Sequence, residues 1–343
     1  MRLFDFFSKR LGVDLGTVNT KIYLSGRGIV INQPTMVAIN TRTDQIIAQG
    51  FSAKKMLGKA PSYVSVVKPL EQGIIVDFEV AEKMLHSAIE KIQASFFSLA
   101  RPEVIISVPL DITEVEKKSF EDVVLRAGAR KIYLVERPVA AAIGIRLPVA
   151  ESVGNIVAEI GGGLTEIAVI ALNGIVAWKS LKIGSETWNK NIIQYIREKA
   201  NLLLGEQTAE EIKIKISSVV PQKEFQEMKV KGRDLITGLP KEISISQEEV
   251  REAILPSVEQ IIEAISDTIE KTPPELVADV LERGIILSGG GAQLKGLADL
   301  INKRIKIPVH VADDPTTSVV RGLGLILEDF ENLKEVLLPS TRE

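Results

Sequence analysis

The sequence contains no cysteine among its 343 residues. This absence excludes a disulfide framework, a thiolate metal site and a cysteine nucleophile, and it agrees with a reducing compartment such as the cytoplasm. Histidine is nearly as scarce, with only His86 and His310. Two histidines argue against a catalytic histidine triad and against a histidine-rich zinc cluster.

Long apolar runs and an excess of positive charge are also missing. No run approaches the roughly 20 residues that a membrane-spanning helix needs. The net charge of -3 and the pI near 5.8 give no reason to expect a nucleic-acid partner. Hydrophobic residues at 45% and charged residues at 25% are ordinary globular values, and a chain of this length predicts two domains.

Two common glycine-rich phosphate motifs are absent as well. The sequence has no Gly-x-x-x-x-Gly-Lys-Ser/Thr run, which a Walker-type phosphate loop requires. It also lacks Gly-x-Gly-x-x-Gly after a first strand, which weakens a dehydrogenase interpretation.

What the sequence does contain is one pattern that occurs twice, at residues 12–24 and 158–170. Each copy is an apolar strand that ends in a carboxylate (Asp14 or Glu159), then a glycine-rich turn, then a second apolar strand. Glycine lets backbone N–H groups approach an anion, and a carboxylate at the strand end suits a divalent cation. Two copies about 145 residues apart predict duplicated domains that close on a nucleotide from both sides.

The rest of the chain alternates between strand-like and helical patterns, which predicts an α/β fold. A third glycine turn, at residues 289–291, follows an apolar strand and precedes a predicted helix near 293–303. Free N–H groups at such a helix start favour an anion or a ribose. Capping boxes are predicted at three helix starts, in the pairs Thr113 with Glu116, Thr208 with Glu211, and Ser246 with Glu249.

Taken together, the motifs resemble the actin-like ATPase superfamily, and within it the MreB family of bacterial actin homologues, over roughly residues 11–328. The segments that carry the resemblance are the two hairpins, an adenine-side helix, an adenosine motif and three family-typical segments. They are Gly12–Thr20, Ile160–Glu166, Thr208–Lys213, Ser288–Ala292, Lys231–Leu235, Gly238–Pro240 and Thr272–Leu276.

The resemblance implies an α/β fold in which duplicated actin-like (ribonuclease H-like) domains flank a nucleotide cleft. The first domain would cover residues 11–150 and contain a small inserted subdomain at about 30–75. The second would cover residues 151–343 and contain a subdomain at about 185–255. Residues 1–10 would form a membrane-binding amphipathic segment.

The resemblance also implies ATP and Mg²⁺ as cofactors, although the residues themselves leave ATP against GTP open. Asp14 and Glu159 would lie near the metal ion, through water. Residues that would bind the phosphates are Asp14, Gly16, Thr17, Val18, Asn19, Gly161, Gly162 and Gly163. Residues that would bind the nucleoside are Ala209, Glu210, Glu211, Ile212, Lys213, Gly289, Gly290, Gly291 and Ala292.

Relatives of this kind polymerise into membrane-associated filaments that help to set rod cell shape. The partners implied are further copies of the chain, envelope-morphogenesis proteins and the inner face of the cell membrane. Membrane contact would use residues 1–10 together with Phe96, Phe97 and Leu99. The expected location is therefore cytoplasmic and peripheral at the cell membrane.

Among the positions that depart from the family pattern, three point to slow or lost hydrolysis. The family usually has aspartate at Glu159 and threonine at Leu164, and a water-orienting glutamate at Arg137, which here follows Glu136. A guanidinium has no acceptor and supplies no base. The catalytic candidates are thus Glu136, Arg137 and Glu159. In one alternative, Arg137 points to solvent and Glu136 takes the role of the family's water-orienting glutamate.

Two other functions remain open from the sequence. One is a phosphotransferase of the same superfamily that acts on a small molecule, although no substrate-facing acid or histidine is evident beyond the shared clamp. The other is a scaffolding paralogue that binds no nucleotide.

Overall fold

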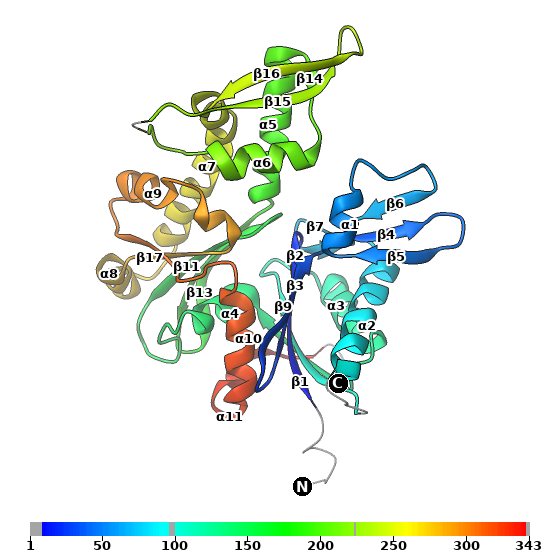
Figure 1. Cartoon of the computed structure of the whole chain (residues 1–343). Coiled ribbons are helices and arrows are strands. Elements are labelled where there is room, and N and C mark those ends of the chain that lie inside the picture. The colour runs from blue at the N-terminus through cyan, green and yellow to red at the C-terminus, as the bar shows by residue number, and fades with distance from the viewer. Residues whose placement is uncertain (1–8, 96–99, 223, 341–343) are drawn as a thin grey trace.

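The computed structural model describes residues 9–95, 100–222 and 224–340, and it contains two large sheets (Figure 1). The first sheet has the strand order β19-β10-β9-β1-β2-β3. Its strands are β1 (Arg10–Leu15), β2 (Asn19–Leu24), β3 (Gly28–Pro34), β9 (Glu103–Val108), β10 (Lys131–Glu136) and β19 (Leu337–Leu338).

The second sheet has the strand order β13-β12-β11-β17-β18. Its strands are β11 (Asn155–Ile160), β12 (Thr165–Ala171), β13 (Gly174–Leu181), β17 (Ile285–Ser288) and β18 (Val309–Val311).

The two sheets repeat one construction. Strand β1 pairs antiparallel with β2 and parallel with β9. In the same way, β11 pairs antiparallel with β12 and parallel with β17. Each glycine turn therefore joins the first two strands of an antiparallel hairpin, at the end where a parallel neighbour also ends. The α/β fold with a duplicated pattern is confirmed.

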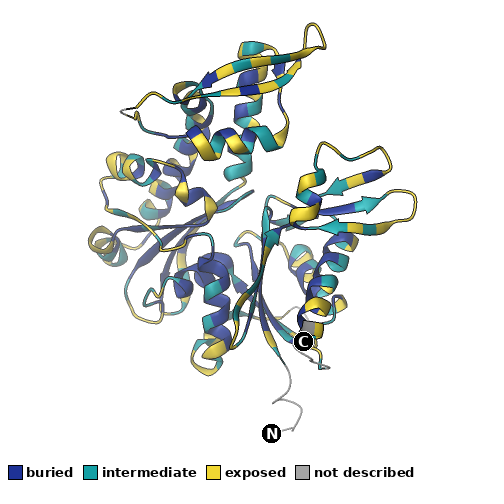
Figure 2. Ribbon diagram, in the orientation of Figure 1, coloured by how far each residue is buried: buried dark blue, intermediate teal, exposed yellow. Residues whose placement is uncertain are grey.

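Helices α2 (Phe78–Ser95) and α3 (Glu114–Arg126) pack on the first sheet, where Met84 and Phe120 join its core. Helices α5 (Ser185–Ala200), α7 (Gln247–Glu270) and α9 (Leu297–Ile305) contribute to the core of the second, with α8 (Pro274–Arg283). Between the sheets lie α4 (Arg137–Gly144) and α10 (Ser318–Glu328), and Val139 and Leu323 share a core there. Both of these helices are largely buried (Figure 2).

Two small sheets extend beyond the large ones, at the top of Figure 1. One combines β4 (Val37–Asn40), β5 (Gln45–Gln49) and β6 (Val64–Val67) with α1 (Phe51–Met56). The other combines β14 (Leu202–Leu203), β15 (Glu227–Asp234) and β16 (Pro240–Ser246) with α6 (Glu206–Ile216). The short pair β7 (Leu70–Glu71) and β8 (Ile74–Ile75) and helix α11 (Phe330–Leu333) complete the main elements.

The predicted helix starts are confirmed in two cases and wrong in one. The capping boxes at Thr113 and Ser246 are present at α3 and α7. The third prediction is wrong, because α6 begins at Glu206 and Gly205 precedes it without a side-chain cap. The helix expected near 293–303 is also shorter at its start: a 3-10 turn at Gly290–Gln293 comes first, and α9 begins at Leu297.

Candidate nucleotide site

A cavity lies between the two glycine turns, one after β1 and the other after β11. Residues from both turns, from α4 and from two C-terminal loops line it. They are Asp14, Gly16, Thr17, Val18, Asn19, Lys21, Arg137, Glu159, Gly161, Gly162, Gly163, Leu164, Ser185, Gly289, Gly290, Pro315, Thr316 and Val319. The structure thus brings the two copies of the repeated pattern to one place.

The two turns approach each other so closely that a side chain on the second turn would clash with its surroundings. A Cβ atom built on Gly162 would lie 2.2 Å from Cγ2 of Val18. One built on Gly163 would lie 2.9 Å from Oγ1 of Thr17 and 3.0 Å from the backbone of Gln72. Glycine is required here for close packing, and it leaves the backbone of the second turn open to the cavity.

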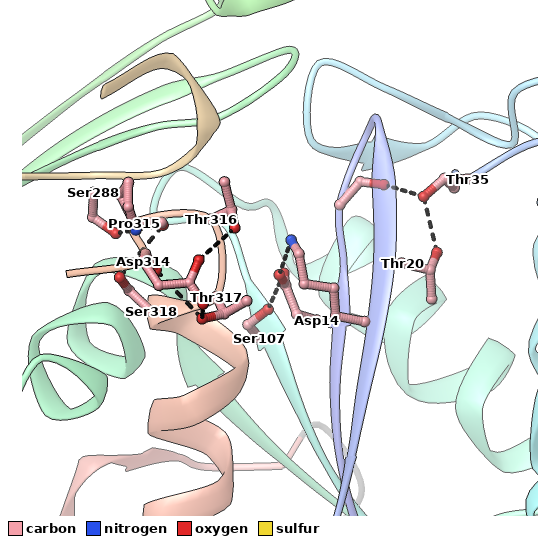
Figure 3. A network of polar contacts seen from close by, with 12 residues as sticks. Asp14, Thr20, Thr35, Ser107, Ser288, Asp314, Pro315, Thr316, Thr317 and Ser318 are labelled. Atoms are coloured by element: carbon pink, nitrogen blue, oxygen red, sulfur yellow. Dashed lines mark hydrogen bonds and ion pairs between the residues drawn. The ribbon is translucent and has the colours of Figure 1, made fainter. Parts of the chain in front are cut away.

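Polar contacts hold the first turn in place. The Thr35 hydroxyl donates to the carbonyl of Gly16 at 2.7 Å, and the hydroxyls of Thr20 and Thr35 are 2.9 Å apart (Figure 3). The N–H of Gly73, at the tip of the β7–β8 pair, donates to Oγ1 of Thr17 at 3.0 Å. These contacts attach the first turn to Thr35 and to the β7–β8 pair.

Asp14 is buried at the end of β1 and already has two partners. The Ser107 hydroxyl donates to its Oδ1 at 3.2 Å, and Nζ of Lys21 lies 3.5 Å from its Oδ2 (Figure 3). These contacts orient the carboxylate at the cavity wall.

Glu159 is buried at the end of β11, and its Oε2 has no hydrogen-bond partner among the described residues. Burial raises the pKa of this carboxyl to about 8, and the charge of Glu166 adds to the rise while that of Arg137 opposes it. An unpartnered buried carboxylate oxygen costs free energy unless a cation, a water or a proton satisfies it.

This burial makes stability depend on pH in the absence of nucleotide and metal. The pKa of this carboxyl rises from 4.5 to about 8 on folding. The protein therefore loses free energy of unfolding as the pH rises through that interval, because the folded state disfavours the charged carboxylate. Glu159→Gln is expected to match the wild type at pH 4.5 and to exceed its free energy of unfolding at pH 8.5 by on the order of 2–4 kcal/mol.

Urea titrations in EDTA at the two pH values measure this difference. The matched control is Glu90→Gln, because Glu90 is an exposed carboxylate outside the cavity. Equal stabilisation of both variants at pH 8.5 would contradict the role of burial.

Arg137 is the first residue of α4 and is buried, with 5% of its surface exposed. Its Nη1 donates to Oε2 of Glu166 at 3.1 Å. The other oxygen of Glu166 accepts from the N–H of Leu110 at 2.6 Å. The alternative in which Arg137 points to solvent is wrong, because Glu166 draws the guanidinium inward; Glu136 is half-buried and does not line the cavity.

The predicted nucleoside-side residues separate into two groups. Glu210, Lys213 and Gly290 line a second cavity that shares Val18 and Asn19 with the first. Lys213 donates to the carbonyl of Ser185 at 3.0 Å, and burial lowers the pKa of its amine to about 8.

The other predicted residues lie elsewhere. Ala209 and Ile212 belong to the apolar core beneath α6, and Glu211 lines a separate groove on the outer side of that helix. Gly289 lines the first cavity, whereas Gly291 and Ala292 are buried behind it.

One part of the site was not predicted from the sequence. The loop before α10 reaches the cavity through Pro315 and Thr316. The N–H of Gly289 donates to the carbonyl of Pro315 at 2.8 Å. Figure 3 shows the contact in which the Thr317 hydroxyl donates to Asp314, at 2.6 Å. The Asp-Pro-Thr-Thr sequence of this loop predicts a turn but has no nucleotide-specific pattern. Its position at the cavity is therefore visible only in the folded structure.

Ion pairs bridge the cleft mouth between the two small sheets. Nζ of Lys68 donates to Glu186 at 2.9 Å and to Glu206 at 2.8 Å. Nearby, Nζ of Lys54 lies 2.8 Å from Glu210. These contacts join β6 and α1 on one side to α5 and α6 on the other.

The residues present fit a magnesium nucleotide. No group of three or more His, Asp or Glu side chains that would hold a metal alone occurs within the described part of the chain. Magnesium typically uses one or two carboxylates together with phosphate oxygens and water. Asp14 and Glu159 supply such a pair, and the open backbone of Gly162 and Gly163 suits phosphate.

Two sheets that share the order of five strands, with β19 added at the edge of the first, are joined around paired glycine turns and define an actin-like fold. A family model described as MreB/Mbl protein matches residues 8–335. The chain therefore belongs to the MreB/Mbl family.

Characterised relatives and solved structures agree. The chain is 40% identical to the cell shape-determining protein Mbl of Bacillus cereus, over 95% of this chain and 98% of the relative. It is 43% identical to the cell shape-determining protein MreB of Escherichia coli, over 94% of each. The ADP-bound structure of MreB5 from Spiroplasma citri superposes with a TM-score of 0.90 at 31% identity, over 95% of this chain and 98% of that one.

A more distant structure, the MamK double helical filament, gives a TM-score of 0.79 at 22% identity, over 94% of this chain and 99% of that one. This likeness shows a shared fold.

The predicted membrane segments lie largely outside the described residues, which begin at Lys9 and omit Phe96, Phe97 and Leu99. Among the described helices, none combines the length and the apolar character needed to cross a bilayer.

Proposed function

We propose that this protein binds ATP with Mg²⁺ in the cleft and assembles into filaments of a cell-shape cytoskeleton. The observation that carries the proposal is the facing pair of glycine turns, with Asp14 and Glu159 at their strand ends. Thr17, Asn19 and the second turn would bind the phosphates, while Glu210, Lys213 and Gly290 would bind the nucleoside. Membership of a family of cell shape-determining proteins supports the cytoskeletal role.

The same cleft supports slow hydrolysis. The side chain that begins α4 and faces the cavity is a guanidinium, which donates hydrogen bonds and accepts none. It therefore cannot accept a hydrogen bond or a proton from an attacking water. Leu164 adds an apolar wall beside the turn.

The cleft-bridging ion pairs would couple nucleotide binding to subunit shape. The N–H groups of Ser185 and Glu186, at the start of α5, donate to the carbonyls of Gly161 and Gly162. Glu186 in turn pairs with Lys68 across the mouth. Phosphate contacts at the second turn would thereby be linked to the two small sheets. The distance between these sheets would set the affinity for a neighbouring subunit.

Lys68→Met is expected to speed release of bound nucleotide about 2–10-fold, because it removes two partly exposed ion pairs worth roughly 0.2–1 kcal/mol each. Displacement of a fluorescent ATP analogue in a stopped-flow instrument measures the rate. Lys83→Met is the matched control, since Lys83 pairs with Asp44 and Glu79 on one side of the cleft. A similar rate change in both variants would count against a role of the Lys68 ion pairs in retaining the nucleotide.

Membrane attachment is proposed from the sequence and from the positions of the described residues at the end of, or after, the two predicted segments. Arg10 pairs with Glu103 in neighbouring parallel strands, and the N–H of Glu103 donates to the carbonyl of Lys9. The described residues Lys9, at the end of the first predicted segment, and Glu103, which follows the second, therefore lie at the same end of the first sheet. This placement supports contact of both predicted segments with one membrane surface, with the protein peripheral at the cytoplasmic face and recruiting envelope-morphogenesis proteins there.

The test uses the full chain with MgATP. ATP binding by calorimetry, sedimentation of filaments in its presence, and co-sedimentation with anionic vesicles are the expected results. Phosphate release is expected to stay close to the spontaneous rate. Stoichiometric release within minutes would contradict slow hydrolysis alone, whereas filaments without any ATP binding would favour the scaffold alternative.

A further inference from the structure

The guanidinium of Arg137 has more hydrogen-bonding capacity than the protein uses. Nη1 donates to Glu166, but the buried Nη2 has no partner among the described residues. Arg137 also lines the cavity between the two glycine turns. A buried donor left unpaired is costly, and a charged one especially so. The side chain is therefore incomplete until an acceptor enters the cavity.

The guanidinium is held in place before that acceptor arrives. Glu166 is fully buried on β12, and the N–H of Leu110 holds its second oxygen. Arg137 is fixed at the start of α4, where Pro138 restricts the backbone. An arginine serving only to neutralise Glu166 would need one nitrogen at this carboxylate. The planar fork leaves the other free for a second anion.

The arrangement of the two cavities indicates in which direction a nucleotide would lie along the cleft. The nucleoside-side cavity is lined by Glu210 and Lys213 and lacks Arg137, Asp14 and Glu159. The cavity with those three residues lies beyond Val18 and Asn19, which line both. A nucleotide with its base beside Lys213 would extend its phosphate chain past the glycine turns, and the last phosphate would come nearest Arg137.

We propose that Arg137 binds the terminal phosphate of a nucleoside triphosphate and makes the cleft prefer triphosphate over diphosphate. The inference rests on the proposed nucleotide binding and adds a specificity-determining residue to it. Nη1 stays on Glu166 while Nη2 contacts a terminal phosphate oxygen. ADP lacks that phosphate and leaves Nη2 unpaired, so the diphosphate state loses this contact and keeps the others.

The experiment compares the affinities of AMPPNP and ADP, each with Mg²⁺, by titration calorimetry. Arg137→Met alone leaves Glu166 without its cation, so the main variant is Arg137→Met with Glu166→Gln, and Glu166→Gln alone is the reference. AMPPNP affinity is expected to fall at least tenfold in the double variant relative to that reference, with ADP affinity within about twofold. Arg197→Met, an exposed arginine outside the cavity, controls for charge.

Arg137→Lys gives a second reading if the double variant does not fold. An ammonium lacks the planar fork that spans Glu166 and a phosphate together, so it too is expected to lose triphosphate preference. An equal loss of AMPPNP and ADP affinity in the variant, or no change in either, would overturn the inference about Arg137. Neither result would contradict the proposal that the wild-type protein binds nucleotide. A wild-type protein that binds neither nucleotide would overturn the proposed function and this inference with it.

Discussion

Replacing Arg137 by methionine is expected to lower the free energy of unfolding of the nucleotide-free protein by about 3–5 kcal/mol. Glu166 is fully buried, and Arg137 is the cation in contact with it. Methionine keeps much of the volume but leaves a buried carboxylate with only the N–H of Leu110 as partner. Removing one member of a buried pair costs more than the pair contributes, because the remaining charge stays desolvated.

Urea denaturation of the single and double variants separates charge from packing. Adding Glu166→Gln to Arg137→Met removes the orphaned charge, so most of the lost stability is expected to return. If the double variant is as unstable as the single one, the loss comes from packing around α4 and the buried ion pair is not its cause. The comparison needs no nucleotide and is independent of the proposed function.

Gly322→Ala is expected to lower the free energy of unfolding by about 3 kcal/mol and to weaken nucleotide binding with it. A Cβ atom on Gly322 would lie 1.7 Å from the carbonyl oxygen of Ala140, and one on Gly144 would lie 1.9 Å from that of Ser318. The backbones of α4 and α10 touch at this crossing, so no side-chain movement makes room. The helices must separate, and α4 carries Arg137 at its start.

Chemical denaturation together with AMPPNP titration measures both effects. Gly205→Ala is the matched control: its Cβ would meet no atom within 4 Å, and its φ of -81° suits any residue. The control is expected to change stability by less than about 1 kcal/mol. A small effect of Gly322→Ala on stability and AMPPNP affinity would mean that the two helices separate easily. This result would contradict a fixed position of Arg137 at the start of α4.

Local features of the fold were predictable from the sequence. Alternating apolar patterns placed the strands on either side of each turn, since side chains in a strand point to opposite faces. The capping boxes at Thr113 and Ser246 were readable because a hydroxyl and a glutamate three residues on satisfy each other's backbone groups. The same signal failed at Thr208, where α6 begins two residues earlier, at Glu206.

The positions of cavity-lining residues were predictable where a glycine turn at a strand end fixes them. Asp14, Thr17 and Gly162 lie on the cavity because a glycine turn at a strand end presents its groups in only a few ways. On α6 the prediction was less selective: Glu210 and Lys213 line a cavity, whereas Ala209 and Ile212 face the core. A motif names consecutive residues, but only one face of a helix meets a ligand.

By itself, the sequence determined the α/β class, the duplicated hairpin and the residues of both glycine turns, because these depend on interactions between near neighbours in the chain. The tertiary structure alone decided that Arg137 turns inward to Glu166 and that Lys68 bridges to Glu186. It also decided that Pro315 joins the cavity. Such contacts depend on how the two sheets and the helices between them are placed, and this placement follows from packing over the whole core.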